Sequence, residues 1–339
     1  MLAYFPTPYP DELLYSVFSR YYAKSGHLAY IYAAEELYVK KTTRPDVEFI
    51  NELTENALES LTRVLSIEEV IQKHTLFPYY GRFLKYERRT KAFDALISMK
   101  GKYHDLLAVP TQRVKYLRYC PLCVKEDRNK HGETYWHRIH HLTGVNICPV
   151  HYCRLENSNI TISSKQSPCL VTAEEEVDET GEVCVSENEL ERKLSRYVMN
   201  VFQLNVNMSC NVNVGTFLHS RLTNSQYVSV RGKKRNMEQL HTDFCKFYEE
   251  LPGNTFTENW QLEKVFSGGR FNTYVICMIG MFLNISPEDF VKMKLPRKSQ
   301  QQIFDDEVIR LHNSGLKYPE ISRRLNASYD YVKVIGGRY

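Results

Sequence analysis

The sequence predicts a mainly α, multidomain helical protein with an embedded Cys3His zinc-finger unit and a C-terminal helix-turn-helix. Three observations predict this fold class. Apolar residues recur every three or four positions through most of the chain, which is the spacing of an amphipathic helix. Two cysteine-containing turns interrupt this pattern, and the last part of the chain holds three short helical segments separated by turn residues. A length of 339 residues exceeds what one small core needs, so several domains are expected.

Residues 1–110 are predicted to form an N-terminal helical domain. A lead with spaced prolines ends at Asp11 and Glu12, and acids here favour the start of a helix because they face the positive end of its dipole. The apolar residues that follow at helical spacing are Leu13, Leu14, Val17, Phe18 and Tyr21. Further helices are expected at about 28–39, 50–63, 67–74 and 87–99.

Two Cys-Pro turns within residues 111–156 predict a zinc-finger segment. Cys120 and Cys123 are separated by two residues, and Cys148 and His151 repeat this spacing after a gap of 24 residues. Each pair can bind one ion from a tight turn, and the two pairs supply the four ligands that tetrahedral Zn²⁺ prefers. Four ligands close the coordination shell and leave no position for water, so a structural rather than a catalytic metal is expected.

Two other interpretations of this segment stay open. The cysteines can be buried thiols without a metal, or Cys148 can be a nucleophile with His151 as its base. The second is weaker, because both residues share one short turn and leave no place for a third group that orients the base. Histidines expected on a polar helix face rather than at the metal are His131, His137, His140 and His141. Cysteines whose spacing does not favour a second metal site are Cys153, Cys169, Cys184 and Cys210.

The middle of the chain separates into an acidic part and a helical part. Residues 157–191 are predicted to be an acidic linker or surface insert, and residues 192–290 a second helical domain. Residues 171–191 hold nine acids and no Lys or Arg, so the net charge of +4 leaves the rest of the chain at +13, the sum of 4 and 9. A basic body suits a polyanionic partner such as DNA.

Residues 291–339 have the order of helices and turns found in a helix-turn-helix. A first helix contains Val308, a second begins at Tyr318, and Ser328 can cap a third. In such a motif the third helix enters the major groove while neighbouring basic residues hold phosphates. The residues expected at DNA are Arg323, Arg324, Ser328, Tyr329, Asp330, Tyr331 and Lys333. The alternatives are a plain three-helix packing unit or, since the third helix lies at the end of the sequence, a truncated form of a longer DNA-binding segment.

Three further basic stretches are candidates for phosphate contacts, and a solvated surface is the alternative for each. They lie at residues 82–89, 113–118 and 230–237. If they bind phosphates, affinity must fall steeply with salt. Their basic residues are Arg82, Lys85, Arg88, Arg89, Arg113, Lys115, Arg118, Arg231, Lys233, Lys234 and Arg235.

Composition argues against several other classes of protein. A content of 43% hydrophobic and 25% charged residues fits a folded globular chain, and the longest apolar run, residues 274–285, is too short to cross a membrane. The first residues lack the pattern of a secretory signal, and nine cysteines are an odd number, so a reducing cytoplasm is expected. The chain contains neither G-x-x-x-x-G-K-[ST] nor G-x-S-x-G, so neither ATP use nor this type of hydrolase chemistry is expected.

Three blocks of the sequence resemble the TniQ/TnsD family, the target-selection proteins of TnsABC-type (Tn-seven-like) bacterial transposons. They are "YFPTPYPDELLYSVFSRYY" at residues 4–22, "HTLFPYYGRFLKYERR" at 74–89 and "RYCPLCVKEDRNKHGETYWHRIHHLTGVNICPVH" at 118–151. Their order and spacing agree with the family, and the likeness covers about residues 1–155. The resemblance carries the four zinc ligands over as Cys120, Cys123, Cys148 and His151.

The resemblance implies a bacterial protein without catalysis of its own. It would recognise an insertion site on double-stranded DNA and recruit a AAA+ ATPase of the TnsC type, which then brings in the transposase. The block at 74–89 is similar to the branch that reads DNA directly, although that branch is usually longer than this chain. The alternative is a TniQ-type adaptor that docks on an RNA-guided Cascade complex and does not read sequence. An enzyme with zinc as a Lewis acid is the third hypothesis.

Overall fold

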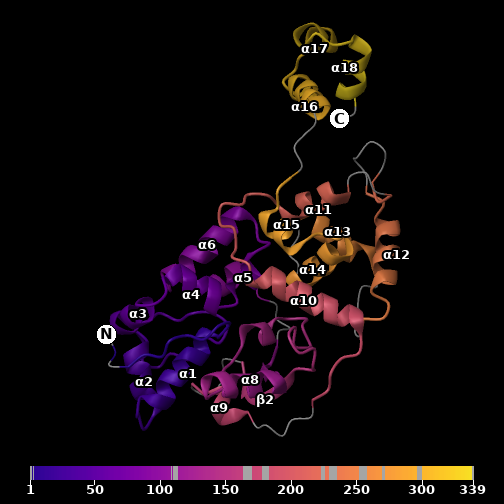
Figure 1. Ribbon diagram of the computed structural model, residues 1–339. Coiled ribbons are helices and arrows are strands. Elements are labelled where there is room, and N and C mark those ends of the chain that lie inside the picture. Colours follow the sequence, from indigo (N-terminus) through magenta and orange to yellow (C-terminus); the bar gives the residue numbers. More distant parts are fainter. Residues whose placement is uncertain are drawn as a thin grey trace. The chain divides into compact units, whose positions relative to one another are not determined.

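The mainly α architecture is confirmed by a computed structural model, in which helices dominate and one small sheet is present among the described residues (Figure 1). The structure describes residues 2, 4–107, 109, 114–162, 170–177, 183–222, 226–228, 235–251, 258–268, 272–295 and 300–337. The chain divides into two compact units, Met1–Lys294 and Leu295–Tyr339. The finer five-part division stays a prediction. Within the described ranges, none of the helices is both long and apolar enough to cross a membrane.

The first hundred residues of the large unit are helical, as predicted. The helices are α1 (Leu14–Lys24), α2 (Tyr30–Leu37), α3 (Glu55–Thr62), α4 (Ile67–His74), α5 (Phe77–Gly81), α6 (Tyr86–Ile97) and α7 (Tyr103–Leu107). Helix α4 begins with a capping box, since Ser66 accepts from the Glu69 backbone N–H and the Glu69 carboxylate accepts from that of Ser66. Pro78 lies in the first turn of α5, where its missing N–H has no cost.

Helix α1 begins at Leu14, so the predicted start at Asp11 and Glu12 is wrong. Asp11 adopts a left-handed backbone with φ of 57°, and the Glu12 side chain is fully buried. Its carboxylate lies 3.0 Å from Arg20 Nη1 and accepts the hydroxyl of Ser16 at 2.8 Å. Burial raises the pKa of Glu12 to about 7, against the opposing effect of Arg20. The acid therefore holds the start of the chain inside the core instead of facing the helix dipole.

A two-stranded antiparallel sheet frames the predicted zinc-finger segment. Strand β1 (Tyr116–Tyr119) pairs with β2 (Glu156–Thr161), with Tyr119 opposite Glu156. Between the strands lie α8 (Pro121–His131) and the 3-10 helix η1 (Arg138–His141). The sheet brings both ends of the segment together. The predicted acidic linker includes β2 and a short helix, α9 (Ala173–Glu176), so part of it is ordered structure.

The rest of the large unit is again helical. Its helices are α10 (Glu189–Gln203), α11 (Val214–Leu222), α12 (Met237–Phe247), α13 (Asn259–Phe266), α14 (Thr273–Phe282) and α15 (Pro287–Lys292). Helix α10 packs against α5, α14 and α15 (Figure 1). It thereby joins the early helices to the later ones in one continuous hydrophobic core.

The small unit consists of three helices, α16 (Gln300–Asn313), α17 (Tyr318–Leu325) and α18 (Tyr329–Gly336). Asn326 ends α17 in the left-handed region with φ of 48°, which asparagine tolerates better than most residues. The buried core of this unit is Val308, Leu311, Ile321, Val332 and Ile335. The order of three helices agrees with the prediction, with Val308 in the first helix and a second helix that begins at Tyr318.

Candidate metal centre

The four predicted ligands come together in the structure. Among the described residues, the ligand atoms of Cys120, Cys123, Cys148 and His151 all lie within 4.8 Å of one another. His151 Nδ1 is 3.4 Å from Cys120 Sγ, 3.3 Å from Cys123 Sγ and 3.8 Å from Cys148 Sγ, and the last two sulfurs are 3.7 Å apart. Zinc bonds of about 2.0–2.3 Å in a tetrahedron separate ligand atoms by about 3.5–3.8 Å. The residues present therefore fit a tetrahedral metal ion.

Local backbone geometry explains why these side chains converge. Cys120 occupies the N-cap of α8, and its sulfur lies 3.4 Å from the backbone N of Cys123. The second turn repeats this contact, with 3.4 Å between the His151 backbone N and Cys148 Sγ. Tyr152 then adopts a left-handed backbone with φ of 59°, which turns the chain back toward the sheet. Hydrogen bonds from Cys120 and Cys123 lower the pKa of the Cys148 thiol, so this sulfur favours the thiolate that a metal needs. Hydrogen bonds to the neighbouring sulfurs raise the pKa of the Cys120 thiol, and the pKa of the Cys123 thiol is raised as well.

The outer nitrogen of His151 has a partner of its own. His151 Nε2 lies 3.0 Å from the Glu126 carboxylate on α8. A carboxylate in this position keeps the hydrogen on Nε2 and leaves the Nδ1 lone pair for a metal. This contact supports the assignment of His151 as the fourth ligand.

The remaining cysteines do not form a comparable group in the described part of the chain. Cys153 is buried, and its sulfur contacts that of Cys120 at 3.0 Å. Cys184 is exposed, and Cys210 lies in the hydrophobic core. Cys169 lies outside the described residues.

Two of the clustered histidines contact aromatic or acidic residues instead of the sulfurs. The His131 ring lies 4.3 Å from that of Tyr9, between ring centres, and so connects α8 to the opening lead. His137 Nε2 lies 2.8 Å from the Asp127 carboxylate. Burial disfavours the charged form of His137, but Asp127 outweighs it, and the net effect raises the pKa of His137.

The other two histidines, His140 and His141, are buried beside the Cys3His group. Burial lowers the pKa of both imidazoles. His141 accepts the backbone N–H of Arg118 at 3.0 Å and lies 2.8 Å from the carbonyl of His137. His140 Nε2 lies 3.6 Å from Cys123 Sγ. The predicted polar helix face is therefore wrong for His140 and His141, since both rings fill the interior around the site.

Two arginines predicted to contact phosphates are instead buried in the core. Arg82 is 2% exposed and its guanidinium donates to the carbonyls of Phe202, at 3.4 Å, and Leu204. These carbonyls end α10, where a cation also offsets the helix dipole. Arg89 is fully buried and donates to the carbonyl of Cys210. Burial lowers the pKa of Arg82 only to about 10, so it stays charged at neutral pH while bound to carbonyls.

Arg118 and Arg88 also bind carbonyls. Arg118 is buried and donates to Val145 at 2.8 Å and Leu142 at 3.1 Å. Half-buried Arg88 donates to the carbonyl of Leu106. The expected phosphate contacts are corrected for Arg82, Arg89 and Arg118, because a guanidinium enclosed by the core cannot reach a DNA backbone.

The other basic residues of the large unit that are predicted to contact phosphates have three kinds of environment. Some are exposed, one stacks on an aromatic ring, and some lie outside the residues that the structure describes. Lys85 and Lys115 are exposed. Arg235 is half-buried, and its guanidinium carbon lies 5.5 Å from the centre of the Phe266 ring. Candidates that lie outside the described residues are Arg113, Arg231, Lys233 and Lys234.

Most candidates of the small unit lie on its surface. Exposed residues among them are Arg323, Arg324, Ser328, Tyr329, Asp330 and Lys333. Tyr331 is half-buried and donates its hydroxyl to Asp305 of α16, so it points back into the unit. This contact argues against its expected place at the base edges, which stays a prediction.

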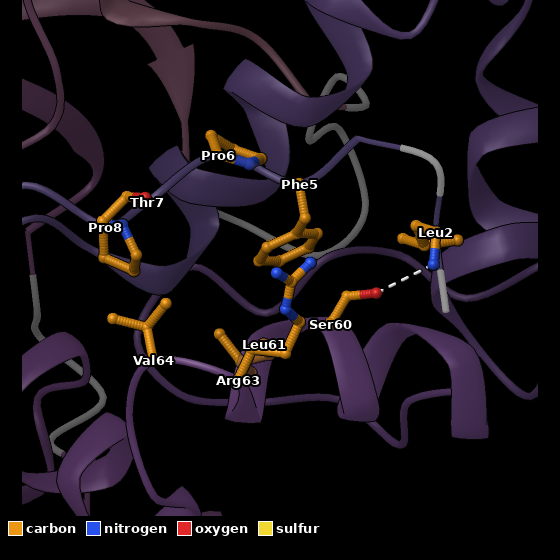
Figure 2. A pocket seen from close by; sticks show the side chains of 9 residues that line it. All are labelled: Leu2, Phe5, Pro6, Thr7, Pro8, Ser60, Leu61, Arg63 and Val64. Atoms are coloured by element: carbon orange, nitrogen blue, oxygen red, sulfur yellow. Dashed lines mark hydrogen bonds between the residues drawn. The ribbon is translucent and has the colours of Figure 1, made fainter.

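A pocket of about 160 Å³ lies elsewhere on the large unit, between the opening lead and α3 (Figure 2). Pro6, Pro8 and Phe5 form one wall, and Leu61 and Arg63 lie opposite. The residues lining it include no cysteine, histidine or acid, so it offers neither metal ligands nor a general base. Among the described residues, the group of His, Cys, Asp and Glu side chains placed to hold a metal ion is the Cys3His group.

The fold and the site together define a mainly helical protein with a Cys3His group that could hold a metal ion. Residues 3–155 match the TniQ family. Over 152 residues the chain is 32% identical to the transposon Tn7 transposition protein TnsD of Escherichia coli, a stretch that covers 43% of this chain and 30% of that protein. Residues 3–155 are therefore a TniQ domain, and the predicted TniQ/TnsD family is confirmed on this part of the chain.

Proposed function

We propose that this protein is a target selector for transposition. It binds double-stranded DNA at the insertion site and recruits a AAA+ ATPase of the TnsC type, which then brings in the transposase. The observation that carries this proposal is the TniQ domain at residues 3–155, with its likeness to a TnsD protein. Selection of this kind needs binding surfaces and no reaction, so we infer that the chain is not an enzyme.

Zinc is the ion that best suits three thiolates and one imidazole. Cys120, Cys123, Cys148 and His151 would hold it, and a full set of four protein ligands gives it a structural role. The bound ion would link the start of α8 to the turn before β2. Because such binding contributes directly to folding, the segment between β1 and β2 depends on it.

The small unit is the proposed DNA-binding part. Its second helix exposes Arg323 and Arg324, and the start of its third helix exposes Tyr329 and Lys333. In a helix-turn-helix the third helix would enter the major groove, and the basic side chains beside it would pair with phosphates. The exposed basic side chains of this unit and the order of its three helices support this assignment.

A second candidate function is the adaptor that docks on an RNA-guided Cascade complex without reading DNA. The burial of Arg82, Arg89 and Arg118 favours it, because these side chains cannot belong to any phosphate-binding surface of the large unit. The two candidates differ in where sequence recognition lies.

Binding of the purified full chain to labelled genomic fragments that flank insertions separates the candidates. The target-selector proposal expects specific binding to bare duplex, with affinity that falls steeply between low and moderate salt. Binding to a AAA+ ATPase of the TnsC type is measured in parallel. ATPase binding without any affinity for bare duplex selects the adaptor, and failure to bind either partner rejects both candidates.

A further inference from the structure

With Zn²⁺ bound, the Cys3His group would carry a net negative charge inside the protein. Three thiolates and Zn²⁺ sum to one net negative charge, and Cys120, Cys123 and Cys148 are only 0%, 6% and 0% exposed. Water is therefore excluded from most of the sulfur surface. A buried anionic group without hydrogen-bond donors is costly, so each sulfur needs a donor from the protein.

Two of the sulfurs have a backbone donor nearby. The Cys123 N–H lies 3.4 Å from Cys120 Sγ, and the His151 N–H lies 3.4 Å from Cys148 Sγ. Within the described residues, Cys123 Sγ has no backbone donor within hydrogen-bond distance. Apart from the metal ligands, the polar atom at that sulfur is His140 Nε2, at 3.6 Å.

We infer that His140 donates its Nε2–H to the Cys123 thiolate and thereby sets the metal affinity of the site and the reactivity of that sulfur. A metal-bound thiolate only accepts hydrogen bonds, so the hydrogen of the neutral imidazole must lie on Nε2. His140 Nδ1 has no partner among the described residues, as expected for the nitrogen that carries no hydrogen. His140 is 1% exposed, so water cannot replace it.

His140 is a positioning residue and not a fifth ligand. His151 Nδ1 lies 3.3–3.8 Å from three sulfurs and already completes the set. The η1 helix that carries His140 is fixed by Asp11, which accepts from the backbone N–H of Ile139 at 3.1 Å and pairs with Arg138 at 3.1 Å. The opening lead thus holds the donor in place against the metal group.

The test uses the full chain and three replacements of His140. Gln places an amide N–H near the position of Nε2, Asn places it near Nδ1, and Leu supplies no donor. His131→Leu is the matched control, since His131 stacks on Tyr9 away from the sulfurs. Metal affinity is measured by competition with a chelator for Zn²⁺ and Co²⁺. The other readouts are the thiolate-to-Co²⁺ charge-transfer band and the alkylation rate of Cys123.

The expected result is a loss of at least about tenfold in metal affinity for His140→Leu and His140→Asn, with faster alkylation and a shifted charge-transfer band. His140→Gln and His131→Leu remain within about threefold of the original chain. If the Leu variant does not fold, comparison of the Gln and Asn variants still tests the hydrogen bond. Both side chains are polar amides, and they differ in the position of the N–H donor.

Three outcomes overturn the inference. Equal affinities in the Gln and Asn variants mean that ring packing matters and the hydrogen bond does not. An unchanged charge-transfer band in His140→Leu removes the donor role. Loss of the imidazole signature of Co²⁺ in His140→Leu but not in His151→Ala makes His140 the ligand. This inference rests on the proposed metal site, and absence of metal binding by the original chain rejects that site instead.

Discussion

The large unit and the small unit use arginine in opposite ways. Arg82 and Arg89 lie in the core and donate to peptide carbonyls, whereas Arg323 and Arg324 lie on the surface of a three-helix unit. Both pairs occur in basic stretches of similar composition. The difference teaches that a basic stretch indicates a phosphate contact only where the fold leaves it exposed. A guanidinium has five donors, and the end of a helix offers unpaired carbonyls that can accept from them.

Removal of the metal should have the largest effect, and it should unfold part of the large unit while the small unit stays folded. In Cys123→Ala, or after treatment with a chelator, the segment between β1 and β2 loses its folded state, because zinc binding in finger peptides contributes about 10–16 kcal/mol of folding free energy. The small unit, which has a core of its own, keeps its structure. Amide hydrogen exchange of both units measures this, with exposed Cys184→Ala as the control. Full protection of the segment in Cys123→Ala would falsify the structural role of the metal.

Acid should destabilise the large unit through His74. Burial lowers the pKa of His74 to about 4, with Arg138 adding to this and Asp11 opposing it. Between about pH 6.5 and pH 4 the unfolded chain binds a proton that the folded chain does not, so stability falls as pH falls through this window. The expected loss is about 3 kcal/mol.

Urea unfolding of the large unit at several pH values measures this effect. His74→Asn keeps a donor near Nδ1, which lies 2.8 Å from the carbonyl of Glu12, but does not titrate. The difference in pH slope between the two chains therefore isolates His74. Equal slopes would show that the acid sensitivity arises elsewhere.

Arg82→Met tests the buried side of the comparison. The change leaves the carbonyls at the end of α10 without their donor, which is expected to lower the free energy of unfolding by about 2–3 kcal/mol. Lys85→Met, at an exposed position nearby, should change it by less than about 0.5 kcal/mol. Thermal or urea unfolding provides the measurement. A normal stability together with weakened DNA binding would reverse the assignment of Arg82.

Replacing both Arg323 and Arg324 by Ala tests the exposed side and should have the smallest effect on stability, within about 0.5 kcal/mol. DNA affinity should fall nearly equally for all sequences, and the salt slope should decrease by about 1 for each arginine that pairs with a phosphate. Fluorescence anisotropy at several salt concentrations measures this. Arg310→Ala is the control, since Arg310 is held by Glu307 at 2.7 Å. Unchanged affinity and slope would remove α17 from the DNA surface.

The Cys3His group could be predicted from the sequence because a spacing of two residues fixes the geometry of a turn locally. The helices could be predicted for the same reason, since their apolar periodicity is local. The roles of Asp11, Glu12 and Arg82 could not, because each depends on a partner outside its own turn of the chain. Glu12 looks like a residue of a helix start, and only its burial beside Arg20 shows otherwise. The role of His140 could not be predicted either, because it depends on the position of Cys123, which lies elsewhere in the sequence.

The carbonyls bound by Arg82 and Arg89 also bear on how this protein can be divided. The TniQ match ends at residue 155, yet Arg82 donates to carbonyls of residues 202–205 and Arg89 donates to that of Cys210 as well as to two carbonyls of its own segment. A protease or a gene fusion that cuts at the edge of the family match would remove these carbonyl acceptors of Arg82 and one acceptor of Arg89, and would expose the face of α5 that packs against α10. The family match and the compact unit therefore differ in length, because the compact unit extends to Lys294.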